Sequence, residues 1–164
     1  MFLVIDMIFR TVGKNSKDHS PEIVYIQFNV TQKPSNQCSM SFVVINMSDI
    51  IKESLTVATT IFYHKHPEFF SGKASIISVS SSVPYSSPYL TSLFIFAFMC
   101  RKYNIWGMDK YVIYGNINMQ ENSTNETFNV TEPFKAKYPD YEHLVNMGYH
   151  DIEKYVAAAT YKGT

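Results

Sequence analysis

Apolar and polar positions alternate along much of the first half of the chain, as they do in half-buried strands. Residues 1–12 are apolar on both faces, whereas 22–31 and 41–47 alternate between apolar and polar side chains. Polar residues fill 13–21, and the turn-forming residues 32–37 separate the second and third stretches. The pattern therefore predicts three strands, the last two joined as a hairpin.

Helical spacing follows these strands. Apolar residues recur every three or four positions on one face of 48–63: Ile51, Leu55, Ala58 and Phe62. Ser48 stands at the expected N-cap, and the helix should end around 64–67. A further strand is predicted at 75–83. The run from Tyr89 to Cys100 is apolar nearly all round, which predicts a central, buried helix over 88–103.

The last third of the chain is less regular. Residues 110–119 have the character of a strand, and 120–131 are polar without periodicity, which predicts a surface loop. Asp140 and Gly148 are typical cap residues, so we expect a short helix from Asp140 through Met147. Residues 152–156 fit either a strand or a helix.

Together these elements predict one α+β domain over residues 1–164, a mixed sheet with helices packed against it. The polar segment 120–131 would be a surface loop inserted in that domain. A chain of 164 residues with 46% apolar content can bury a sizeable core.

The composition of the chain argues against some classes of binding partner. Fourteen basic and fourteen acidic residues cancel, which argues against a dedicated nucleic-acid binder. The longest apolar runs are too short to cross a membrane, and the start lacks the features of a signal peptide. We therefore expect no membrane association and an intracellular rather than a secreted protein, with the five Asn-x-Ser/Thr sequons unmodified. Cys38 and Cys100 suggest neither a disulfide framework nor a zinc site.

Ser87 is the first candidate for chemistry. A strand, a serine-rich turn and a serine at the start of a buried helix can present a nucleophile, with helix N–H groups stabilising an oxyanion. The same residues also fit an ordinary helix start, with Ser87 as N-cap and Pro88 at N1. The local sequence favours the cap.

Four short motifs extend the first possibility. Residues 47–54, Met-Ser-Asp-Ile-Ile-Lys-Glu-Ser, open the first helix, and 85–89, Tyr-Ser-Ser-Pro-Tyr, surround Ser87. Tyr114-Gly115-Asn116 lie within the strand predicted at 110–119, and 134–137, Phe-Lys-Ala-Lys, precede the last predicted elements. In order and spacing, residues 22–157 resemble the proteolytic domain of Lon-type proteases, which shares its superfold with the second domain of ribosomal protein S5.

The resemblance implies a serine–lysine dyad. Ser87 would form an acyl-enzyme with a polypeptide substrate, and Lys137, or alternatively Lys135, would take its proton. Such a lysine must be desolvated to become neutral near pH 7. Ser86, Tyr114 and Asn116 would shape the site around the oxyanion. No cofactor is implied, and no Gly-rich phosphate-binding loop is present.

Several motif positions depart from the family. Pro88 and Tyr89 replace small residues next to the serine, and Asn116 replaces a glutamate. We therefore predict a catalytically degenerate Lon-like domain that serves as a structural or protein-interaction module, in a homo-oligomer or a larger complex. An active peptidase is the alternative. We assign no metal to His64 and His66, since a helix C-terminus favours charged histidines there.

Overall fold

A four-stranded mixed sheet forms the base of the protein. The computed structural model describes residues 7–15, 17–87, 89–106, 108–124 and 131–162. The strands are β1 (Met7–Lys14), β2 (Pro21–Pro34), β3 (Ser39–Met47) and β4 (Lys73–Tyr85), in the spatial order β1-β2-β4-β3. The β1–β2 and β2–β4 pairs are antiparallel, and the β3–β4 pair is parallel. The predicted α+β class with a mixed sheet is thereby confirmed.

The predicted hairpin between the second and third strands is wrong. Strand β4 lies between β2 and β3, so these two strands do not pair. Residues 35–38 do turn the chain, but β3 then runs parallel to β4, and such a pair requires a long crossover. Helix α1 (Asp49–Lys65) provides that crossover. The neighbour of β3 is thus set by a segment 26 or more residues further along the chain.

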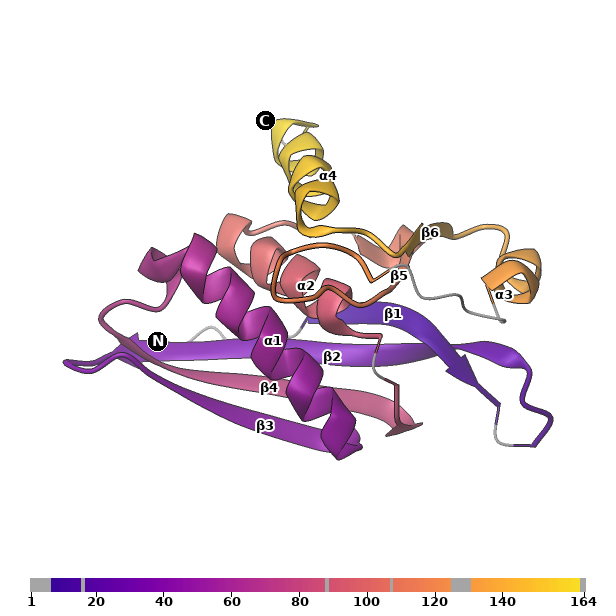
Figure 1. Cartoon of the computed structure of the whole chain (residues 1–164), viewed down its shortest axis with the longest axis horizontal. Coiled ribbons are helices and arrows are strands. Elements are labelled where there is room, and N and C mark those ends of the chain that lie inside the picture. Colours follow the sequence, from indigo (N-terminus) through magenta and orange to yellow (C-terminus); the bar gives the residue numbers. More distant parts are fainter. Residues whose placement is uncertain (1–6, 16, 88, 107, 125–130, 163–164) are drawn as a thin grey trace.

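Helices α1 and α2 (Thr91–Tyr103) cover one face of the sheet (Figure 1). The first ten side chains of α2 are all buried, which confirms its predicted central position. Phe98 of α2 packs between the rings of Phe28 and Phe62, with centroids 5.1 and 5.0 Å away. This aromatic cluster joins the sheet to both helices.

A second, smaller layer lies on the far side of α2. It consists of the parallel strands β5 (Tyr111–Tyr114) and β6 (Glu142–Val145), with helices α3 (Thr131–Lys137) and α4 (Tyr149–Lys162). β5 lies beside β1, and α4 packs on α2 (Figure 1). Two short 3-10 turns, Pro67–Phe69 and Met108–Lys110, complete the described elements.

This layer corrects two expectations. The strand expected at 110–119 is limited to β5, and the helix expected at 140–147 is instead β6. The helix begins after Gly148, because Leu144 and Val145 extend the small sheet beside β5. Residues 118–122 of the predicted loop form a hydrogen-bonded turn, and Thr131 already begins α3. Residues 125–130 lie outside the described part.

Candidate functional site

The turn between β4 and α2 carries Ser86 and Ser87. Helix α2 begins at Thr91 with Leu90 in the N-cap position, so the prediction that Ser87 caps a helix over 88–103 is wrong. Ser87 Oγ instead accepts a hydrogen bond from the backbone N–H of Tyr89, at 3.3 Å. Ser86 Oγ accepts one from the hydroxyl of Ser48, at 2.9 Å. Both hydroxyl groups thus stabilise the junction of β4 with the two helices.

Residues 114–116 lie directly against this junction. The amide of Gly115 donates to the carbonyl of Tyr89 at 2.9 Å, and the Ser92 hydroxyl donates to the carbonyl of Gly115 at 3.0 Å. Asn116 Oδ1 accepts a hydrogen bond of 2.6 Å from Thr91 Oγ1. The structure therefore brings the Ser87 turn and the Gly115 segment together, although they are separate in the sequence.

Gly115 is required for this contact. Its φ of 154° is unfavourable for other residues, and an added Cβ would lie 3.0 Å from the backbone of Asn146. Tyr114, just before it, is fully buried with its ring against Phe134 of α3. In this arrangement Tyr114 is a core residue, and Asn116 is an acceptor for the first turn of α2.

The two candidate lysines lie on α3 and are exposed to solvent. Lys137 Nζ donates to the backbone carbonyl of Pro21 at 2.9 Å and lies 5.6 Å from the centre of the Tyr138 ring. None of the polar contacts of Lys137 within the described residues is with Ser87. Among the described residues the structure does not join the predicted nucleophile to the predicted base, and it leaves that lysine exposed to solvent.

A different polar cluster lies where α1, α2 and α4 meet. His66 Nε2 is 3.1 Å from the hydroxyl of Tyr149, and its Nδ1 is 2.6 Å from Lys102 Nζ. Lys102 also forms an ion pair with Glu68. Because an ammonium group can only donate, Nδ1 accepts, and this assigns the ring proton to Nε2. This arrangement favours a neutral ring that donates to Tyr149, whereas the Glu68 carboxylate, 3.6 Å from Nδ1, favours the charged form.

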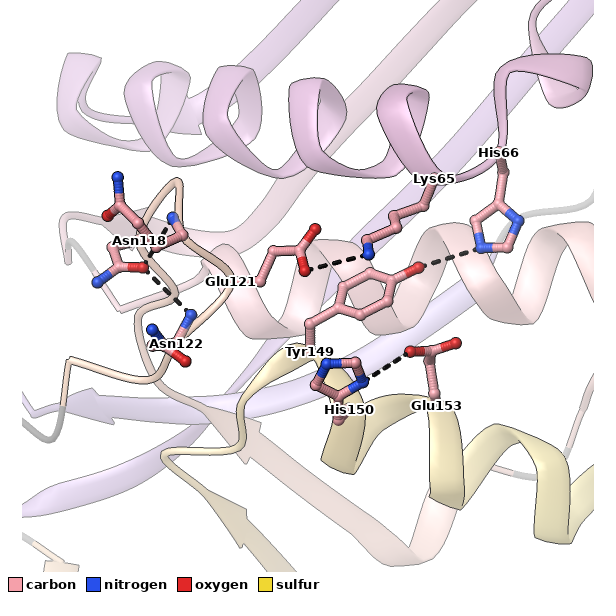
Figure 2. Close-up of polar contacts among 9 residues, drawn as sticks. Lys65, His66, Asn118, Glu121, Asn122, Tyr149, His150 and Glu153 are labelled. Atoms are coloured by element: carbon pink, nitrogen blue, oxygen red, sulfur yellow. Dashed lines mark hydrogen bonds and ion pairs between the residues drawn. The ribbon is translucent and has the colours of Figure 1, made fainter.

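The turn at Glu121 completes this His66–Tyr149 cluster (Figure 2). Lys65 Nζ is 3.2 Å from the Glu121 carboxylate and 5.4 Å from the centre of the Tyr149 ring. The Asn118 side chain holds the turn by accepting from the amides of Gln120 and Asn122. The polar contacts of this cluster therefore connect the start of α4 with the ends of α1 and α2.

Burial alters the acid–base behaviour of this cluster. Desolvation lowers the pKa of His66, and the positive charge of Lys102 lowers it further. Desolvation likewise raises the pKa of Tyr149. The expectation of a charged histidine at the end of α1 is therefore wrong for His66. The local sequence could not have revealed this, since Lys102 and Tyr149 are 36 and 83 residues away.

Neither region offers an evident place for a metal ion, because the described residues include no group of three or more His, Cys, Asp or Glu side chains suited to one. No described helix is both long and apolar enough to span a membrane. Cys100 is buried in α2, and desolvation raises the pKa of its thiol to about 12, so this thiol is not activated.

Comparison with known proteins adds no assignment. No family model matches the chain, and no curated protein matches its sequence.

Proposed function

We propose that this protein is a catalytically silent domain of Lon-protease-like architecture that acts as a structural or protein-interaction module. The order of three strands, a helix, a strand ending in a Pro-bearing turn and a buried helix supports the likeness. So does the contact of the Gly115 segment with the turn that carries Ser87.

One observation supports the proposed lack of catalysis. The ammonium group of Lys137 is exposed and donates to a backbone carbonyl, while the hydroxyl of Ser87 accepts a backbone N–H. A general base must be neutral and within hydrogen-bond reach of the hydroxyl that it activates. Within the described residues Lys137 forms its hydrogen bond with Pro21 and none with Ser87, which supports the proposal.

The backbone amides at the start of α2 are also poorly placed to stabilise an oxyanion. The amides of Tyr89 and Ser92 already donate to Ser87 and to the Gly115 carbonyl. Donors in use within the protein cannot stabilise a developing negative charge without rearrangement. The serines of this turn serve the fold in this proposal, and the module acts through its surface.

A serine-reactive fluorophosphonate probe tests the proposal on the intact chain. We expect no labelling, and no difference between the wild type, Ser87→Ala and the matched neighbour Ser86→Ala. Labelling that disappears in Ser87→Ala and Lys137→Ala but persists in Ser86→Ala would overturn the proposal. It would establish the alternative, a peptidase that acts through an acyl-enzyme at Ser87.

A further inference from the structure

Strand β3 is an edge strand without charged residues. Its sequence, Ser-Met-Ser-Phe-Val-Val-Ile-Asn-Met, spans nine residues and contains neither charge nor proline. Among the described strands it pairs with β4 alone, and it forms the lower margin of the sheet in Figure 1. Edge strands expose a row of backbone N–H and C=O groups, and proteins usually protect them with lysine, proline or a covering element.

The other edge of the sheet is protected in this way. Strand β1 carries Arg10 and Lys14, and the small sheet lies beside it through β5. Arg10 is further held by an ion pair with Asp109. The two edges of one sheet therefore differ, and only β3 has the properties of a pairing surface.

The side chains of β3 are apolar on both faces. Met40 and Val44 pack against the core, whereas Val43 and Ile45 belong to the bare face of the sheet and are 42% and 57% exposed. Phe42 is also 42% exposed. A bulge at Asn46, whose φ is 65°, interrupts the pairing with β4 only at the end of the strand. The segment 39–45 remains regular.

We propose that β3 pairs with β3 of a second copy of this chain, antiparallel about a two-fold axis at Val43. In this register Val43 lies opposite its own copy, Phe42 opposite Val44, and Ser41 opposite Ile45. A two-fold interface brings the same surface of both copies together. A charged side chain near the axis would therefore lie opposite an identical charge and be repelled by it. The absence of charge from β3 removes that repulsion.

This self-complementarity favours a second copy over a foreign peptide. Two four-stranded sheets would become one continuous sheet of eight strands, with the exposed apolar residues of β3 in cross-strand pairs. A nine-residue strand is only about 30 Å long, so the contact is smaller than a standard stable interface, which buries about 800 Å² per partner. We therefore expect reversible dimers that depend on concentration. The inference goes beyond the proposed function, because an active peptidase could pair in the same way.

Sedimentation velocity of the full chain, from about 1 to about 200 µM, tests the pairing. We expect the wild type to shift from monomer to dimer across this range. Val43→Lys and Val43→Glu should each remain monomeric, and an equimolar mixture of the two should form heterodimers. Ile8→Lys, a charge placed at an exposed position on the opposite edge, is the matched control and should dimerise like the wild type.

Three results would overturn the inference. The wild type could stay monomeric at the highest concentration, Val43→Lys could dimerise as well as the wild type, or the mixture could fail to restore dimers. Circular dichroism would first establish that each variant is folded, which we expect because Val43 is exposed. Probe labelling of Ser87 is a separate readout, so the failure of one proposal is distinguishable from the failure of the other.

Discussion

Individual polar residues hold the elements of this protein together at two places. At the start of α2, the side chains of Ser92 and Asn116 form hydrogen bonds between this helix and the Gly115 segment, and Ser87 stabilises its own turn through Tyr89. At the ends of α1 and α2, His66 connects Lys102 to Tyr149. Residues that suggest chemistry in the sequence thus have structural partners in the fold.

The lowered pKa of His66 predicts a pH dependence of stability. Because its folded pKa lies below the ordinary value of 6.5, the unfolded chain binds more protons as the pH falls through that value. The free energy of unfolding should therefore be highest above about pH 7 and decline on acidification, by at most about 1.4 kcal/mol per pH unit from this group.

Urea unfolding of the wild type, His66→Gln and His64→Gln at about pH 8 and about pH 5.5 checks this dependence, in a range above the ordinary pKa of the neighbouring Glu68. His66→Gln should show a smaller loss than the wild type between the two pH values. His64→Gln, an exposed histidine two residues earlier on α1, should keep the full loss. Equal losses in all three proteins would contradict the assignment.

At the scale of elements, the joint between β5 and α2 depends on a close approach of backbones. The backbone of Gly115 forms hydrogen bonds with Tyr89 and Ser92, and the backbone of Asn146 lies close to its Cα. The small sheet is therefore joined to the central helix at a position that tolerates no side chain.

Gly115→Ala should lower the free energy of unfolding by at least about 2 kcal/mol, since it adds a steric contact to an unfavourable φ. Gly72→Ala is the matched control, because Gly72 has a φ of 70° but open space around its Cα. At Gly72 only the unfavourable φ contributes, and we expect it to lower the free energy of unfolding by about 1 kcal/mol. Equal losses in urea unfolding of the two variants would show that the contact with Asn146 is unimportant.

For the whole molecule, the strand order makes the protection of backbone amides from hydrogen exchange uneven. Strands β2 and β4 have a neighbour on both sides, whereas β3 has a described neighbour on one side only. Local opening costs least where backbone hydrogen bonds are few and exposed. The apolar core beneath α1 and α2 should therefore be the last part to open.

Hydrogen exchange of the dilute chain checks this expectation. Amides of β4 around Ile77 and Val79 should exchange most slowly, and about half of those of β3 should exchange quickly, because they face the open edge. Raising the protein concentration should slow the β3 amides alone if that strand pairs with a second copy. Strong protection of all β3 amides in the dilute chain would contradict an open edge.

Most elements of the large sheet and both of its helices could be predicted from the sequence. Periodicity located β2, α1, β4 and α2 within a few residues, since burial of one face imposes a spacing on each of them. Short segments failed, as β6 did, because four residues carry too little pattern to outweigh cap residues such as Asp140 and Gly148.

The sequence by itself determined the α+β class, the buried α2 and most of the large sheet. Only the tertiary structure decided which strands are neighbours and which polar groups meet. Strand order depends on the crossover through α1, and the partners of Lys137 and His66 come from segments far away in the chain. Local patterns record which faces are buried, but long-range packing decides what each face and each side chain contacts.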